Sequence, residues 1–304
     1  MEHKREKSGK NHDSRKMRSR NEGGFTDRQE RGRNEGRFAD RQMRDRNEGR
    51  FADREEHAGD SGRIEGRNAV REAFRAGQTI DRVYVQEACR DDAVLTIVKL
   101  ARQAGCPVDQ VPRERLDRMS ETGHHQGVIA QTAAGSYASV EDILKKAEEA
   151  GEPPFLILLD GIEDPHNLGA IIRTANQAGA HGVIIPKRRA AGLTAVVART
   201  SAGALSYTPV ARVTNLHTTI RELKERGIWF VCADMKGPQM YRQNLTGPIG
   251  LVIGNEGSGV SRLVRECCDF TASIPMYGDI DSLNASVAAG VLAFEIARQR
   301  HAGE

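Results

Sequence analysis

From Ile64 onward the chain alternates short apolar runs with longer segments in which apolar residues recur at helical spacing. Between residues 61 and 136 this pattern predicts helices at GRNAVREAFRAG, AVLTIVKLARQAG and RERLDRMS, and strands at DRVYVQ, CPVDQVP and GVIAQTA. Such alternation indicates a small α/β domain. The next segment, SVEDILKKAEEAGEPP, predicts a helical linker within residues 137–153, which Gly151 and the prolines end.

The second half of the chain, residues 154–304, repeats the alternation with strands that are almost wholly apolar, such as FLILLD, GVIIP, IWFVCAD and GLVIG. Short apolar strands separated by helices predict a parallel sheet that is covered on both faces. Ligands on such sheets bind beyond the carboxyl ends of the strands. Three polar loops follow predicted strands, namely DGIEDPHN, GNEGSGVS and PMYGDIDSLN, and they are the candidate site.

The first 60 residues lack this pattern and predict a disordered tail. No Leu, Ile or Val precedes Ile64, and the tail carries 17 Lys and Arg against 14 Asp and Glu. Units of 13 residues begin at Asn21, Asn34 and Asn47, each with one Phe. Two interpretations remain. Arginine and spaced phenylalanine suit weak RNA contact, whereas the near balance of charge suits a solvated extension without a specific partner.

Cysteine usage and the N-terminus predict a cytoplasmic protein. The five cysteines are odd in number, show no C-x-x-C spacing and have no histidine ligand pattern beside them, so we expect neither a disulfide framework nor a metal site. The N-terminus is charged, and no apolar run approaches the 18 or so residues of a membrane span.

The loop GNEGSGVS has the spacing of a phosphate-binding loop but not its charge. Val260 stands where that motif has its lysine, and Glu256 adds an anion. No G-x-G-x-x-G is present in this half of the chain either, so a nucleoside triphosphate or a dinucleotide is disfavoured. We expect Gly257 to adopt positive φ in a loop that approaches a ligand closely.

The segment DPHNLGAIIRTANQAG predicts a helix that Asn167 caps, with an apolar stripe formed by Leu168, Ile171 and Ile172. Arg173 points away from that stripe. Because an arginine near a helix N-terminus opposes the macrodipole, it needs another reason to be there. It is either a solvated surface charge or a guanidinium aimed at an RNA phosphate beside the reacting atom.

The loop PMYGDIDSLN leads into a helix for which Ser282 or Asn284 is the expected cap. The apolar positions assigned to that helix are Val287, Val291 and Phe294. Capping accounts for one of the two polar residues and leaves the other for a ligand.

Three segments together resemble the signature motifs of the SpoU (TrmH) family of RNA ribose 2′-O-methyltransferases, which belongs to the SPOUT superfamily. The family patterns are N-x-G-x-x-x-R-[ST], G-x-E-x-x-G and S-L-N-x-[AS]-x-A, and DPHNLGAIIRTANQAGA, VIGNEGSGV and IPMYGDIDSLNASVAAG match all of their positions. GRNAVREA and HHQGVIA are similar to the L30e-like substrate-binding domain of the family. The most similar subgroup methylates a guanosine of 23S rRNA in the peptidyl-transferase region.

The resemblance implies a SPOUT-type parallel sheet with a C-terminal trefoil knot, preceded by an L30e-like α/β domain. It implies S-adenosyl-L-methionine as cofactor, RNA as substrate, no metal, and a homodimer formed through the catalytic domain. The implied catalytic residues are Arg173, Asn167, Glu256, Ser282 and Asn284; the implied cofactor-binding residues are Gly254, Ile274, Leu283, Gly257 and Asn284. In the family the arginine works with a substrate phosphate. A tRNA methyltransferase and a non-catalytic RNA-binding relative remain as alternatives.

Overall fold

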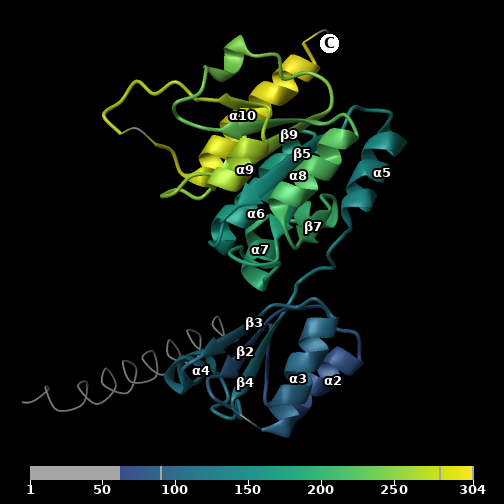
Figure 1. Cartoon of the computed structure of the whole chain (residues 1–304), viewed down its shortest axis with the longest axis vertical. Coiled ribbons are helices and arrows are strands. Elements are labelled where there is room, and N and C mark those ends of the chain that lie inside the picture. Colours follow the sequence, from purple (N-terminus) through teal and green to yellow (C-terminus); the bar gives the residue numbers. More distant parts are fainter. Residues whose placement is uncertain (1–61, 90, 281, 303–304) are drawn as a thin grey trace, which may run out of the picture. The chain divides into compact units, whose positions relative to one another are not determined.

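The computed structural model describes residues 62–89, 91–280 and 282–302, which form a smaller and a larger α/β part (Figure 1). The predicted tail and its repeats lie outside the described residues, so the prediction of disorder stays untested. The elements of the smaller part are β1 (Arg63–Glu65), α2 (Arg67–Arg75), β2 (Ile80–Gln86), α3 (Asp92–Gln103), β3 (Val108–Val111), α4 (Arg113–Met119) and β4 (Val128–Thr132).

The smaller part is a four-stranded sheet with the strand order β1-β4-β2-β3. β4 is antiparallel to both β1 and β2, whereas β2 and β3 are parallel. Val70 of α2 and Ile97 of α3 are fully buried in one cluster with Val83 and Val128 of the sheet, so the apolar faces predicted from the sequence are the buried ones. Strand β1 was not predicted, because its three residues, RIE, include a single apolar side chain.

The larger part is a six-stranded parallel sheet with the order β10-β8-β9-β5-β6-β7. Its strands are β5 (Phe155–Asp160), β6 (Gly182–Pro186), β7 (Val210–Val213), β8 (Trp229–Ala233), β9 (Ile249–Gly254) and β10 (Phe270–Ala272). Its helices are α5 (Val140–Ala150), α6 (Pro165–Gln177), α7 (Ala195–Thr200), α8 (Leu216–Glu225), α9 (Arg262–Cys267) and α10 (Ala285–Arg300), with short 3₁₀ turns at Ala204–Ser206 and Met240–Arg242.

Helices cover both faces of this sheet, as the apolar strands predicted. Along β5, Phe155 and Ile157 belong to a core shared with α6 and α10, while Leu156 belongs to a second core shared with α5 and α8. Helix α5 is therefore more than the predicted linker. Its Ile143 and Leu144 are buried in the second core, so this helix is an integral part of the larger fold.

The order of the strands fixes where a ligand can bind. The chain passes from β5 outward through β6 to β7, and then returns to the other side of β5, where β9 pairs with it. The connections that leave the carboxyl ends of β5 and β9 consequently diverge to opposite sides. Open α/β sheets bind ligands at such switch points. The helix α6 follows β5 and the glycine loop follows β9, which places two of the three predicted loops here.

Of the three apolar positions assigned to α10, Val291 is half-buried, but the other two lie off the buried face of the helix. The residues that α10 buries in the core are Ala285, Ala289, Leu292, Ala293 and Ile296. Val287 and Phe294 point outward and are 49% and 51% exposed. Because apolar residues occur around the whole circumference of α10, its periodicity does not identify the buried side.

Candidate functional site

The helix α6 begins at Pro165, and the residue directly before it, Asp164, is its cap. The Asp164 Oδ1 accepts a hydrogen bond from the His166 backbone N–H at 3.0 Å, and proline suits the first helical position. The prediction that Asn167 caps α6 was therefore wrong. As the third residue of the helix, Asn167 instead directs its side chain toward the loop after β9.

The glycine loop is closed by a pair of backbone hydrogen bonds. Asn255 N–H donates to the Gly259 carbonyl at 3.1 Å, and Gly259 N–H donates to the Asn255 carbonyl at 2.8 Å. Gly259 has φ +66°, but Gly257 is not among the residues with positive φ, so the conformation expected for Gly257 was wrong. The Asn255 side chain supplies the turn, because its Oδ1 accepts from Gly257 N–H at 2.9 Å.

Gly254 is the position in this loop where only glycine fits. A Cβ on Gly254 would lie 2.1 Å from the Gly259 carbonyl carbon, whereas a Cβ on Gly257 would meet only the Asn255 Oδ1, at 3.5 Å. The loop is also tied to β5, since the Asp160 Oδ2 accepts from the Ser261 N–H at 2.8 Å. The sequence analysis did not predict a role for Asn255 or Asp160, although each lies at the end of an apolar strand.

A hydrogen-bond network joins the three predicted loops. Glu256 Oε1 accepts from Asn167 Nδ2 at 3.0 Å, from Ala285 N–H at 3.3 Å and from Asn284 Nδ2. Asn284 Nδ2 also donates to Asn167 Oδ1 at 3.0 Å. Residues separated by 89 and 28 positions from Glu256 thus meet on one carboxylate. Glu256 holds the N-termini of α6 and α10 together.

Asn284 rather than Ser282 is the cap of α10. The Asn284 Oδ1 accepts from Ser286 N–H at 2.9 Å, while its Nδ2 takes part in the network. The sequence left Ser282 and Asn284 as alternative caps. Asn284 is the cap because it directly precedes Ala285, the first residue of the helix. Ser282 is exposed and lines the cleft beside the network.

A cleft of about 270 Å³ opens beside Glu256. It is lined by most of the residues predicted to bind cofactor or substrate: Gly254, Glu256, Gly257, Ile274, Ser282 and Leu283. Ile253 and Leu292 extend its apolar wall. Asp234 and Arg265 line it as well, and sequence reasoning missed them. The signal for Asp234 was its place directly after the apolar strand IWFVCA.

Arg173 lies outside the network. As predicted, it is exposed, while Ile171 and Ile172 beside it are fully buried. Its side chain makes neither an ion pair nor a hydrogen bond with any residue that the structure describes. It follows Asn167 by six residues, which is about 9 Å along the helix axis. The structure therefore does not bring Arg173 to Glu256, and it leaves the guanidinium available to an external anion.

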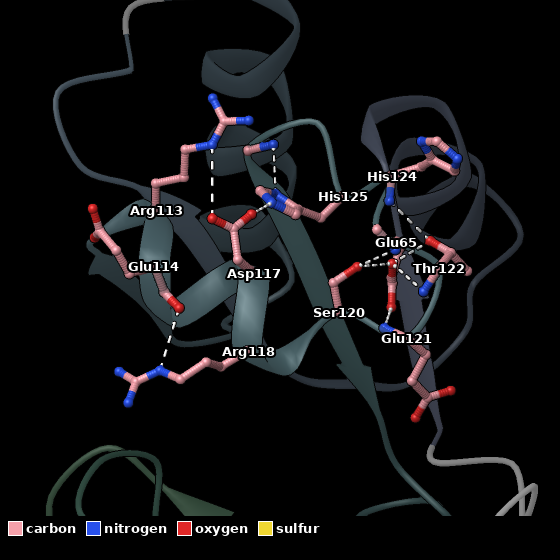
Figure 2. A network of polar contacts seen from close by, with 12 residues as sticks. Glu65, Arg113, Glu114, Asp117, Arg118, Ser120, Glu121, Thr122, His124 and His125 are labelled. Carbon is pink, nitrogen blue, oxygen red and sulfur yellow. Dashed lines mark hydrogen bonds and ion pairs between the residues drawn. The ribbon is translucent and has the colours of Figure 1, made fainter.

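The smaller part holds a second polar network, centred on Glu65 (Figure 2). The Glu65 carboxylate accepts from Ser120 Oγ at 2.6 Å, from Glu121 N–H at 2.6 Å and from Thr122 N–H at 3.4 Å. Burial acts to raise the pKa of Glu65, but the hydrogen bonds from Ser120, Thr122 and the backbone outweigh it and lower the pKa to about 2. Glu65 therefore fixes the loop that follows α4.

The two segments of the smaller part that carry the family resemblance contact each other directly. Arg67, from GRNAVREA, donates through Nε to the Gln126 carbonyl at 3.0 Å, and its backbone N–H donates to Gln126 Oε1 at 3.2 Å. The backbone of Gln126 has φ +50°, which is uncommon for a residue other than glycine. The buried His125 accepts at Nδ1 from Gly127 N–H and donates through Nε2 to Asp117 (Figure 2). This loop is held in one conformation.

Replacing Glu65 by glutamine should make the protein less sensitive to acid. A carboxylate with a depressed pKa contributes stability above its ordinary pKa, and that contribution is lost as the pH falls from 4.5 toward 2. The free energy of unfolding of the wild type should therefore fall by roughly 1–3 kcal/mol more than that of Glu65→Gln over this range. Unfolding by urea, followed by far-UV circular dichroism, measures the difference. Glu87→Gln, an exposed control, should behave as wild type; equal acid losses in Glu65→Gln and wild type would contradict the assignment.

Neither a metal centre nor a membrane span is found in the described part of the chain. No group of three or more His, Cys, Asp or Glu residues there could hold a metal ion. No described helix has both the length and the hydropathy needed to cross a bilayer. All five cysteines are free thiols.

Two family models match the chain. Residues 154–294 match the SpoU rRNA methylase family, and residues 63–138 match the RNA 2′-O ribose methyltransferase substrate-binding family. The first match contains the glycine loop and both asparagines of the Glu256 network, and the second contains the Glu65 network.

Relatives and solved structures agree with these matches. The chain is 50% identical over 238 residues to the putative TrmH family tRNA/rRNA methyltransferase YacO of Bacillus subtilis, across 78% of this chain and 95% of the relative. It is 48% identical to an uncharacterized tRNA/rRNA methyltransferase of Mycolicibacterium vanbaalenii, across 77% and 76% of the two chains. The SpoU methyltransferase AviRb of Streptomyces viridochromogenes, solved in complex with AdoMet, matches with a TM-score of 0.51 and 27% identity, across 79% of this chain and 91% of AviRb. The chain belongs to the SpoU (TrmH) family of RNA methyltransferases.

Proposed function

We propose that this protein transfers a methyl group from S-adenosyl-L-methionine to the 2′-hydroxyl of a ribose in structured RNA. The observation that carries the proposal is the meeting of three loops on Glu256, at the switch point of a parallel sheet and beside a cleft. Membership of the SpoU family supports the reaction, and the related AviRb was crystallised with the same cofactor.

The cleft has the chemistry that S-adenosyl-L-methionine requires. Ile274 and Leu283 give it an apolar wall suited to adenine, and Glu256 is compatible with a cationic sulfonium. The close approach of backbone at Gly254 leaves room for no side chain, so main-chain groups line this part of the cleft. We assign cofactor binding to Gly254, Gly257, Ile274, Leu283 and Asn284. When bound, the cofactor supplies an electrophilic methyl group.

The network residues act by positioning. Because Glu256 Oε1 already accepts from three donors, we assign Glu256 the task of holding Asn167 and Asn284 in place, with Ser282 on the rim of the cleft. Arg173 has no such bonds and is available to an RNA phosphate. An arginine keeps its proton at ordinary pH, so it is not itself the base. We propose that Arg173 and a substrate phosphate together favour deprotonation of the 2′-hydroxyl.

The favoured substrate is a guanosine of 23S rRNA in the peptidyl-transferase region. The support is the resemblance of the two-part layout to that subgroup, and the match of residues 63–138 to the substrate-binding family. The alternative substrate is tRNA, because the relatives are named tRNA/rRNA methyltransferases. A non-catalytic RNA-binding relative is disfavoured, because Arg173 and the S-L-N motif are intact.

The test is to map 2′-O-methyl groups in total RNA from cells that lack the gene and from their parent. Purified protein and labelled S-adenosyl-L-methionine should then restore the lost methyl group on the unmodified RNA. Loss of a single rRNA guanosine methyl group would support the full proposal, whereas loss in tRNA would establish the alternative. RNA that stays unlabelled with active cofactor present would contradict catalysis.

We further propose that residues 154–304 form a trefoil knot and that residues 61–136 are an L30e-like domain, both on the strength of the family resemblance. We also propose that the protein works as a homodimer in the cytoplasm, where its RNA substrates are made. The exposed apolar side chains on α10 support the dimer, because Val287 and Phe294 are seven residues apart and so share one outward face of the helix, which a second copy could cover.

Replacing Phe294 by aspartate should convert the proposed dimer into a monomer. The charge would be placed at the centre of an apolar contact, where burial of an unpaired carboxylate is strongly unfavourable. Multi-angle light scattering coupled to gel filtration should show half the wild-type mass. Leu95→Asp, which changes a similarly exposed apolar residue on α3, should keep the wild-type mass. A wild type that elutes as a monomer would remove the basis of this prediction.

A further inference from the structure

A fixed carboxylate lies at the carboxyl end of β8, outside the three signature motifs. The Asp234 Oδ1 accepts from the Lys236 N–H at 3.0 Å, and its Oδ2 forms an ion pair with Arg265 Nη1 at 2.8 Å. The Asp234 side chain is only 11% exposed, and its backbone N–H donates to the Ala272 carbonyl at 3.0 Å. The carboxylate is therefore held in one orientation before any ligand binds.

The order of the strands places Asp234 between the two ends of the proposed cofactor site. The Glu256 network lies at β5 and β9, and the apolar wall of Ile274 and Leu283 follows β10. β8 lies between β9 and β10, and Asp234 lines the same cleft. In an adenosyl cofactor the ribose connects the adenine to the sulfur. A cofactor with its adenine on the apolar wall and its sulfur near the network therefore has its ribose beside β8.

The carboxylate retains the capacity to accept hydrogen bonds there. An ionised carboxylate offers about four lone-pair sites, and the structure shows one donor on each Asp234 oxygen. A ribose diol presents two O–H donors, and acidic side chains at strand ends bind ribose hydroxyls in other open α/β folds. The pairing with Arg265 keeps Asp234 oriented, and Asp234 lines the cleft.

On this geometry, and resting on the proposed function, we propose that Asp234 accepts hydrogen bonds from the 2′- and 3′-hydroxyls of the adenosyl ribose. Arg265 is a positioning residue that holds the carboxylate. A purely structural role for Asp234 would require only the turn to Lys236 and the ion pair. Neither of these contacts responds to the hydroxyls of a ligand, so the two roles are separable by experiment.

The experiment is calorimetric titration of the full-length protein with S-adenosylhomocysteine and with its 2′-deoxy and 3′-deoxy analogues. The wild type should bind at least one deoxy analogue roughly tenfold or more weakly than the parent compound, because a hydrogen bond to a charged acceptor is lost. Asp234→Asn, which can still accept from Lys236, should bind the parent roughly tenfold more weakly and should discriminate less than about twofold between the compounds.

Glu266→Gln is the matched control, since Glu266 follows Arg265 on α9 but does not line the cleft. It should discriminate between the compounds as the wild type does. Equal affinity of the wild type for all three compounds would overturn the inference without any variant, and so would full discrimination by Asp234→Asn. A wild type that binds none of the three contradicts the proposed cofactor itself, and this outcome is distinct from a failure that concerns Asp234 alone.

Discussion

Replacing Arg173 by alanine is expected to slow single-turnover methyl transfer by roughly a hundred- to a thousandfold, the usual loss for an electrostatic group at a reacting centre. Arg173 is exposed, lies off the buried face of α6 and has no partner among the described residues. Its removal should leave the fold unchanged and keep the affinity for S-adenosyl-L-methionine within about threefold, since surface substitutions cost little stability.

Gln177→Ala is the control for this effect. Gln177 is exposed on α6 and follows Arg173 by four residues, so it shares the same face of the helix one turn further on. It should transfer methyl groups at the wild-type rate. Arg173→Lys separates charge from geometry, because lysine keeps the charge but cannot contact a phosphate with two parallel donors. A rate for Arg173→Ala within about threefold of wild type would remove Arg173 from the proposed site, given the effect expected of a catalytic electrostatic group.

The fold of the larger part was predictable because its strands are buried on both faces. FLILLD and GLVIG read as continuous apolar runs, and these are β5 and the body of β9. The helix α5 was harder to predict, since its amphipathic sequence is compatible with a linker, and the burial of Ile143 against Gly182 of β6 shows that it packs on the sheet. β1 was too short for any periodicity to predict it.

The membership of the site was predictable from motifs, but its geometry was not. Local spacing predicted that Asn167 caps its helix, whereas Asp164 is the cap and Asn167, inside the helix, donates a hydrogen bond to Glu256. That contact joins residues 89 positions apart, and it depends on the strand order, which no local pattern encodes. Asp234 directly follows an apolar strand, but this position alone did not identify it, because the strand order decides which strand ends line the cleft.

Replacing Gly254 by alanine should strongly weaken the binding of S-adenosyl-L-methionine. The new Cβ would lie 2.1 Å from the carbonyl carbon of Gly259 and 2.2 Å from the Val260 nitrogen. Backbone atoms cannot rotate away as a flexible side chain does, so the two hydrogen bonds between Asn255 and Gly259 must break. We expect an affinity loss of about a hundredfold or more, together with a stability loss of roughly 1–3 kcal/mol from overpacking. Calorimetry and thermal unfolding measure the two effects.

Gly257→Ala is the control for Gly254→Ala, because it changes another glycine of the same loop. Its Cβ would meet only the Asn255 Oδ1, at an ordinary 3.5 Å, and the Gly257 backbone does not require positive φ. Affinity should therefore stay within about threefold of wild type, because alanine keeps the backbone groups of residue 257 that we assign to the cofactor site, and its methyl group lies in open space. If Gly254→Ala binds the cofactor as well as Gly257→Ala does, then the loop after β9 does not form the cofactor pocket. If both variants lose binding equally, the methyl group added at residue 257 obstructs the cofactor, and the close approach at Gly254 is not what shapes the site.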